Sequence, residues 1–146
     1  MAILYEQYDA FTGLSPAWRS KVSAFFQLHN AEAGRDIVED TLDYALKVRP
    51  SFGGFIITAS DKDKIIAGVL VNKTGMDGFN PPYIFAFANM DTNHPKSKPA
   101  MQELIKRTTQ KTKGKVGMHL RPDNPVIPVF ESMGFKSTYV DLRLRS

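Results

Sequence analysis

The sequence predicts one mixed α/β domain that spans residues 1–146. The apolar spacing alternates along the chain between helical stripes and β-branched runs. Read in order, these segments give strand, helix, helix, three strands, helix, strand, helix and a final strand. No repeat or linker interrupts this order, and 146 residues are enough to bury one core. A composition of 42% hydrophobic and 23% charged residues is ordinary for a soluble globular protein.

The first elements are a short strand at Ile3–Tyr5 and a helix that begins at Ser15-Pro16. Serine is a good N-cap, and proline is favoured at the first helical position because it has no N–H to leave unpaired. Apolar residues at helical spacing continue this helix to about Asn30.

A second helix is predicted to begin at Asp36, with Glu39 as its capping-box partner, and to run through Val48 to a stop at Pro50. The chain around it is acidic, which either reflects a solvated helix face or would suit a cationic ligand. The acidic residues are Glu32, Asp36, Glu39, Asp40 and Asp43.

Three strands follow. Phe55–Ala59 and Ile65–Val71 form a hairpin across the polar SDKDK segment, and Tyr83–Met90 is apolar enough to be covered on both faces. Asp61 and Asp63 resemble the start of a calcium loop, but the glycine and closing glutamate of such a loop are missing, so no metal site is predicted.

The C-terminal third continues with a helix after Ser97 that runs through Thr108 and fades in QKTKGK, then an alternating strand at Lys115–Leu120. Asp123-Asn124-Pro125 opens a short helix with Asn124 as its N-cap, and this helix ends at Gly134. A last strand is expected at Lys136–Leu144.

Charge and residue types exclude several classes of function. The absence of cysteine excludes disulfides, thiolate metal sites and a cysteine nucleophile. The first residues lack the layout of a signal peptide and no apolar run is long enough for a membrane span, so we expect a cytoplasmic protein without membrane contact.

Basic residues gather in Lys96–Lys115, where seven lysines and arginines face the single acid Glu103, a local balance of +6 within a net charge of +4. This run is either a solvated face or a surface that attracts a polyanion. It coincides with the strand, loop and helix of Tyr83–Thr109. A helix N-terminus directs free N–H groups and a positive dipole end at its surroundings, so this loop is a natural phosphate site.

These features together resemble the GCN5-related N-acetyltransferases (GNAT). The element order agrees over essentially the whole chain, the strand-loop-helix falls where that family binds the pyrophosphate of acetyl-coenzyme A, and DNPVIPVFESMGF is similar to the family's C-terminal helix motif. The resemblance implies a central, mixed, mostly antiparallel sheet flanked by helices. It also implies transfer of an acetyl group from acetyl-CoA to a primary amine of a small molecule or peptide.

The resemblance assigns a set of residues to the cofactor. In the family's phosphate loop the present chain reads Pro95–Ala100, where Lys98 replaces a glycine and Pro99 has no N–H. Two lysines can instead supply charge directly to phosphate oxygens. The residues expected to bind the cofactor are Met90, Lys96, Ser97, Lys98, Ala100, Met101, Asn124 and Phe130.

No catalytic residue is assigned. The family often protonates the leaving thiolate with a tyrosine, and Phe130 stands at the matching position, with Glu131 next to it because the run is one residue short. Asn89 and His94 are weak candidates near the apolar strand, while His29 and His119 show no partner by spacing. Whether this strand separates from its neighbour to admit the pantetheine arm, as it does in the family, is a question for the structure.

Two other functions stay open. A non-catalytic module that binds acyl-CoA or a protein partner would need neither the tyrosine nor the glycine. A nucleic-acid-binding module could use Lys96–Lys115, although this run lacks interleaved aromatic residues and any recognition motif. A homodimer is neither established nor excluded.

Overall fold

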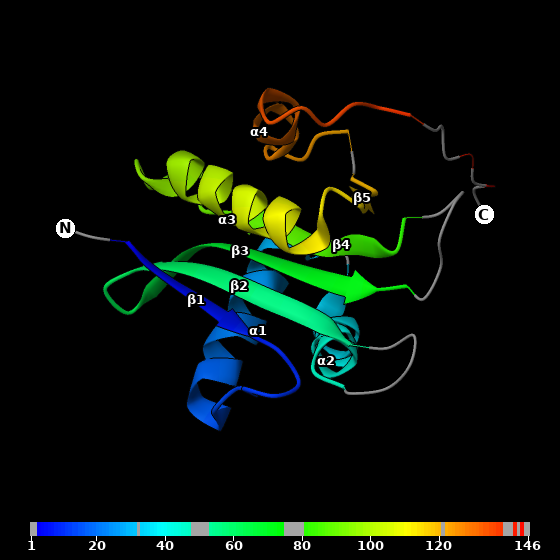
Figure 1. Ribbon diagram of the computed structural model, residues 1–146. Coiled ribbons are helices and arrows are strands. Elements are labelled where there is room, and N and C mark those ends of the chain that lie inside the picture. The colour runs from blue at the N-terminus through cyan, green and yellow to red at the C-terminus, as the bar shows by residue number, and fades with distance from the viewer. Residues whose placement is uncertain are drawn as a thin grey trace.

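A five-stranded sheet in the order β1-β2-β3-β4-β5 runs through the middle of the protein (Figure 1). The computed structural model describes residues 3–31, 33–47, 53–74, 81–120, 122–138, 142 and 144. The strands are β1 (Leu4–Tyr8), β2 (Gly54–Asp61), β3 (Lys64–Lys73), β4 (Tyr83–Met90) and β5 (Val116–Met118). Neighbours pair antiparallel except β4 and β5, which are parallel. The predicted mixed, mostly antiparallel sheet is confirmed.

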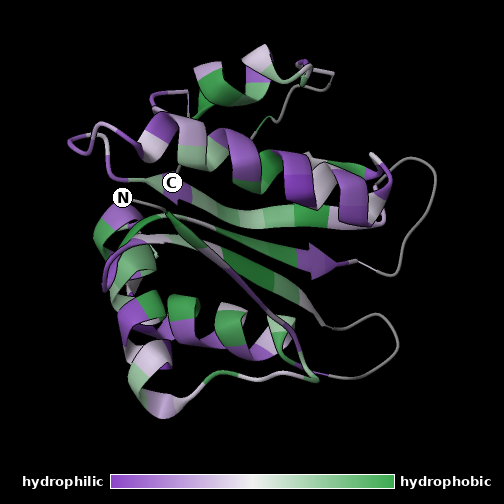
Figure 2. Ribbon diagram, turned by 60° about the vertical axis from the view of Figure 1, so that its left-hand side comes forward, coloured by the Kyte–Doolittle hydropathy of each residue, from purple (hydrophilic) through white to green (hydrophobic). Residues whose placement is uncertain are grey.

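Helices cover both faces of the sheet. On one face lie α3 (Ser97–Thr112) and α4 (Ile127–Ser132), and on the other lie α1 (Pro16–His29) and α2 (Gly34–Ala45) (Figure 2). Each face has its own apolar cluster, one built around α3 and α4 and one around α1 and α2. The near-continuous apolarity of β4 is explained by this arrangement, because its side chains serve both clusters.

The predicted ends of helices and strands agree best with the structure where a capping residue or the end of an apolar run marks them. Ser15 caps α1, its hydroxyl accepting the N–H of Trp18 at 3.2 Å, and β4 begins and ends where the apolar run does. The hairpin of β2 and β3 is also confirmed, with a tighter turn at Lys62-Asp63 than expected.

The predicted cap of the second helix is wrong. α2 begins at Gly34, its N-cap residue is Ala33, and no side chain caps it. Glu39 cannot complete a capping box because Ser23 donates its hydroxyl to this carboxylate and Arg19 binds it at 3.0 Å. A tertiary contact has therefore replaced the local one. The predicted end is also wrong, because α2 stops at Ala45 with Leu46 as its C-cap and does not continue to Val48.

α3 ends at Thr112, inside the QKTKGK segment where the helix is expected to fade, and its C-cap Lys113 adopts a left-handed conformation. Two other C-terminal predictions need correction. Asn124 is not the N-cap of α4, which is Val126; it instead forms the preceding turn, where its side-chain oxygen accepts the N–H of Val126 at 3.0 Å. Of the strand expected at 136–144, residues 136–138, 142 and 144 are described, and none of these is in a strand.

The packing of α1 on the sheet depends on a glycine. A Cβ at Gly68 of β3 would lie 3.3 Å from the rings of Phe25 and Phe26, tighter than ordinary contact. Phe26 is fully buried and stacks on Phe87 of β4 with 5.1 Å between ring centroids. The glycine thus lets α1 approach closely, and this sets where the C-terminal end of α1 lies relative to β4.

A charged cluster joins α1 to α2. Arg19 binds both Glu39 and Asp43, at 3.0 and 2.9 Å, and Gln27 donates to the Ser23 hydroxyl at 2.8 Å. The Ser23 hydroxyl and Arg19 hold the pKa of Glu39 below its ordinary value. The ionised form of Glu39 is therefore the one that stabilises the pairing of the two helices.

We expect Glu39→Gln to lower the free energy of unfolding at pH 7 by about 1 kcal/mol or less, since this pair is partly screened by solvent. A lowered folded pKa gives stability that is complete above the unfolded value near 4.5 and is lost as the pH falls through the folded one. The difference from wild type should therefore shrink below pH 4.5, as followed by urea unfolding from pH 7 to 3. Asp40→Asn, on the exposed neighbour, is the matched control. A difference that does not change with pH would contradict this account.

Candidate active site at the separation of β4 and β5

β4 and β5 are paired over only three positions. Tyr83, Ile84 and Phe85 face Val116, Gly117 and Met118, and there β5 ends. β4 continues to Met90 while remaining paired with β3. Beyond Phe85, the β5 side of β4 therefore has no partner strand in the part of the chain that the structure describes. The residues of β4 beyond Phe85 line a cavity instead.

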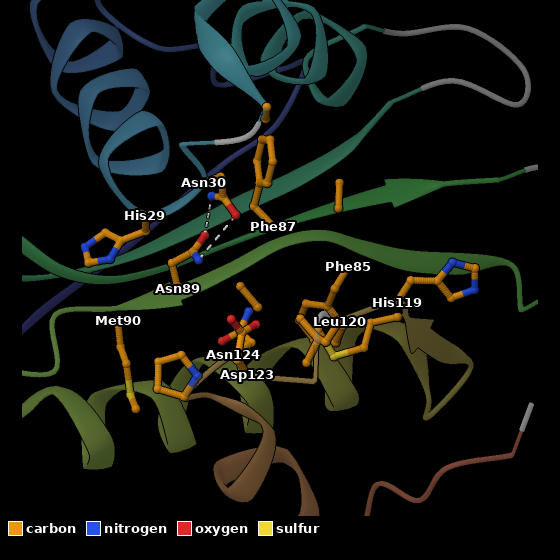
Figure 3. A pocket seen from close by; sticks show the side chains of 15 residues that line it. His29, Asn30, Phe85, Phe87, Asn89, Met90, His119, Leu120, Asp123 and Asn124 are labelled. Carbon is orange, nitrogen blue, oxygen red and sulfur yellow. Dashed lines mark hydrogen bonds between the residues drawn. The ribbon is translucent and has the colours of Figure 1, made fainter. Parts of the chain in front are cut away.

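A cavity of about 350 Å³ lies at this separation (Figure 3). Its walls come from the C-terminal end of α1, the second half of β4, and the chain from β5 to α4. The lining residues are His29, Asn30, Ala33, Phe85, Ala86, Phe87, Ala88, Asn89, Met90, Met118, His119, Leu120, Asp123, Asn124 and Pro125.

A bulge in β4 shapes the cavity. Val71 faces Phe85 and Leu70 faces Phe87, so Ala86 is an extra residue without a partner on β3. The bulge reverses the alternation of side chains. Phe85 packs edge-on against Phe130 of α4 at 5.1 Å, whereas Phe87 packs on the opposite face against α1. Bulges commonly re-aim side chains and interrupt pairing beside functional sites.

Two asparagines join α1 to β4 at the cavity. The Asn30 amide donates to Asn89 Oδ1 at 2.7 Å and to the Phe26 carbonyl at 2.9 Å. Asn89, one of the two weak catalytic candidates, is 5% exposed. Its amide cannot accept a proton at neutral pH, so its position fits a structural link better than a proton carrier.

Histidines stand at opposite ends of the cavity (Figure 3). His29 is the last residue of α1, and its ring rests against Phe25 with 4.6 Å between centroids. Burial lowers the pKa of His29, and the Asp91 carboxylate partly offsets this. His119 lies just after β5 and is exposed. Sequence reasoning set both aside because spacing along the chain cannot show a cavity formed by α1 and β4.

His94, the other weak catalytic candidate, does not line the cavity. Its Nε2 is 2.8 Å from Asp61 Oδ2, and its Nδ1 accepts the N–H of Lys96 at 3.1 Å. An accepting Nδ1 places the ring proton on Nε2, which then donates to Asp61. The His94 hydrogen bond holds the pKa of Asp61 below its ordinary value. His94 therefore fastens the loop before α3 to the turn of the hairpin.

The N-terminus of α3 is largely satisfied by its own loop. The N–H of Ser97 donates to the His94 carbonyl at 3.2 Å, and that of Ala100 donates to the Lys96 carbonyl at 3.1 Å. Pro99 has no N–H to donate. A phosphate here would depend on the side chains of Lys96 and Lys98 more than on a backbone cradle.

The remaining cofactor candidates separate into two groups. Met90 and Asn124 line the cavity. By contrast, the Ser97 hydroxyl is buried and donates to the Ile66 carbonyl at 3.3 Å. The side chains of Ala100, Met101 and Phe130 are at most 3% exposed and belong to the core beneath α3 and α4.

Neither the described acids of α2 nor the basic run Lys96–Lys115 lines the cavity. Glu39 and Asp43 pair with Arg19 between α1 and α2. In the basic run, Arg107 lies over the Tyr5 ring and Lys111 over the Phe55 ring. Part of that run thus covers the sheet.

No three histidines, aspartates or glutamates among the described residues lie close enough together to hold a metal ion. The described helices also include none that is both long and apolar enough to cross a membrane.

Solved acetyltransferases share this fold. The chain is similar to the aminoglycoside N-acetyltransferase AAC(6')-Iy in complex with CoA, at 11% identity and a TM-score of 0.67, covering 100% of this chain and 97% of that one. It is also similar to an aminoglycoside acetyltransferase meta-AAC0020 from an uncultured soil metagenomic sample in complex with sisomicin, at 13% identity and a TM-score of 0.63, covering 99% of this chain and 95% of that one. A putative acetyl transferase from Pyrococcus furiosus aligns at 11% identity with a TM-score of 0.64, covering 98% and 100%.

No protein-family model matches the chain, and neither does any curated protein sequence. The structural similarity confirms the predicted GNAT fold over essentially the whole chain. At these identities it establishes the fold alone.

We expect His94→Ala to lower the free energy of unfolding by about 1–2 kcal/mol, because it removes two hydrogen bonds of ordinary strength. It should also speed amide exchange at Lys96 and Ser97, because the Lys96 N–H donates to the His94 ring and the Ser97 N–H donates to the His94 carbonyl. Hydrogen exchange followed by NMR would measure both effects. Asp61→Asn, which retains an acceptor oxygen, should change exchange less. Unaltered exchange at Lys96 in His94→Ala would rule out the fastening role.

Proposed function

We propose that the protein is an acetyl-CoA-dependent N-acetyltransferase that acts on a primary amine of a small molecule or peptide. The observation that carries this proposal is the separation of β4 from β5, which opens a cavity beside an unpaired strand edge in a fold shared with solved acetyltransferases. A thioester arm laid along that edge would find backbone N–H and C=O groups ready to bond it. The same edge can polarise the carbonyl that the amine attacks.

The residues present would bind the cofactor with lysine side chains in place of part of the family's backbone phosphate cradle. Met90 and Asn124 line the cavity and would contact the pantetheine arm. Lys96 and Lys98 would neutralise the phosphates by charge. Ser97 would stay part of the loop beneath the phosphates. Ala100, Met101 and Phe130 would support the site from the core, because their side chains are buried.

The acceptor would enter from the α1 side of the cavity, opposite the chain that leads to α4. There it meets His29, Asn30 and Ala33. Two of the solved neighbours are named as aminoglycoside acetyltransferases, but an aminoglycoside is not assigned here, because the described acids of α2 lie away from the cavity. We propose the cytoplasm as the compartment. A homodimer stays a hypothesis.

A non-catalytic acyl-CoA-binding module is the second candidate. Two observations favour it: the N–H groups at the start of α3 are mostly occupied within the loop, and Phe130 is buried between Phe85 and Phe135 where the family often has a tyrosine. Binding without turnover of any amine would identify this alternative.

Calorimetric titration tests the cofactor site. We expect acetyl-CoA to bind the wild type in the micromolar range and Lys98→Ala to weaken binding by roughly tenfold, about 1.4 kcal/mol. Added salt should weaken the wild type more than the variant, since a charged contact is lost. Lys106→Ala removes an exposed lysine later on the same helix and is the matched control. The absence of binding heat at millimolar acetyl-CoA would overturn the proposal.

Substitution of the residue at the tyrosine position gives a second test. Phe130→Tyr adds a hydroxyl among the rings of Phe85 and Phe135, and an unpaired buried hydroxyl costs about 1–3 kcal/mol. We expect a lower free energy of unfolding and no increase in acetyl transfer, measured by urea unfolding and by thiol release with a panel of amines. A faster transfer rate would show instead that this position reaches the reaction.

A further inference from the structure

His29 occupies a distinctive place in the cavity. It is the last residue of α1, half-buried, and lines the wall next to Asn30, Asn89 and Met90 (Figure 3). Its ring rests on Phe25 at 4.6 Å between centroids and a tilt of 51°. The neighbouring Asn30 is tied to Asn89 of β4 at 2.7 Å. The imidazole is thereby positioned at the end of the cavity through which an acceptor would enter.

The surroundings of His29 favour the neutral ring before reaction. Burial lowers its pKa, and the Asp91 carboxylate opposes this effect. That carboxylate already accepts the N–H of Asn93 at 3.0 Å and pairs with Lys64 at 3.2 Å, so its pull on His29 is reduced. The other ionisable residues of the lining, His119 and Asp123, are exposed and come from the chain after β5.

The same surroundings can accept a positive charge once it forms. His29 lies in the last turn of α1, where the carbonyl end of the helix dipole favours a cation. Asp91 lies near enough to act on it electrostatically. A group that is neutral at rest and tolerated as a cation has the properties of a proton acceptor near neutral pH.

We propose that His29 is the general base that takes the proton from the acceptor amine, an inference that rests on the proposed acetyl transfer. The amine nitrogen forms a C–N bond to the acetyl carbon, and the C–S bond breaks with its electron pair remaining on sulfur. The proton that the nitrogen loses goes to the imidazole of His29. The thiolate takes one proton from water, and His29 returns its own to solvent.

The test compares His29→Asn with wild type on the amine that the wild type acetylates fastest in a panel of small amines and peptides. We expect kcat to fall by about 100-fold or more, while the Kd for acetyl-CoA changes by less than twofold. The wild-type kcat/KM should rise with pH to a plateau, with a midpoint below 6.5, and the variant should lack this acidic limb. NMR titration of the His29 ring should give the same midpoint.

Three further variants separate loss of the base from loss of structure. His29→Ala should regain activity when imidazole is added, because the cavity left by the side chain admits it, and His29→Gln guards against loss of packing on Phe25. His119→Asn removes the other histidine of the cavity and should keep the acidic limb. Thermal unfolding of each variant shows that it is folded.

The possible results separate this inference from the function on which it rests. If His29→Asn acetylates the amine at the wild-type rate with the same pH profile, His29 is not the base and the acetyltransferase function stands. If the wild type binds acetyl-CoA but acetylates no amine in the panel, both the base and the enzyme are overturned, and the acyl-CoA-binding module takes their place.

Discussion

The pairing of β4 with two different neighbours is the constraint on which the structure depends. β4 must hydrogen-bond to β3 along its length, because both strands lie in the middle of the sheet and an unpaired buried backbone group is costly. It pairs with β5 only as far as Phe85 and Met118. The backbone left over on the β5 side lines a cavity, where a ligand or water can satisfy it. The site thus arises from a sheet that stops pairing on one side.

The bulge at Ala86 allows β4 to line the cavity while its large side chains still pack in the core. Because it reverses the alternation of β4, Phe85 joins the cluster under α3 and α4, while Phe87 joins the one under α1 and α2. Both large rings are buried, and the small exposed Ala86 between them lines the cavity with them. On the α1 side, Gly68 allows the close packing that brings His29 and Asn30 to β4.

The loop before α3 shows how a shared fold can carry different binding chemistry. In this chain, His94 and the loop carbonyls occupy N–H groups that a phosphate would otherwise use. These hydrogen bonds stabilise the loop in the absence of a ligand. If the proposed cofactor binds here, its phosphates would depend on lysine side chains, whose contribution falls as the salt concentration rises. Such a site would bind an anion more weakly than a backbone cradle does.

The sequence by itself determined the element order as far as the last helix, the cap at Ser15 and the bounds of β4, because capping and hydrophobic period are local properties. The GNAT fold was expected from the resemblance of its motifs to that family. The sequence could not determine that Glu39 would leave its own helix cap for Arg19 and Ser23, or that Asn124 would form a turn and not a cap. Nor could it place His29 and Asn30 beside Asn89, 59 positions after Asn30. Those outcomes depend on strand register, on one bulge and on how closely α1 packs. Only the tertiary structure decides these, since each is set by contacts between residues far apart in the chain.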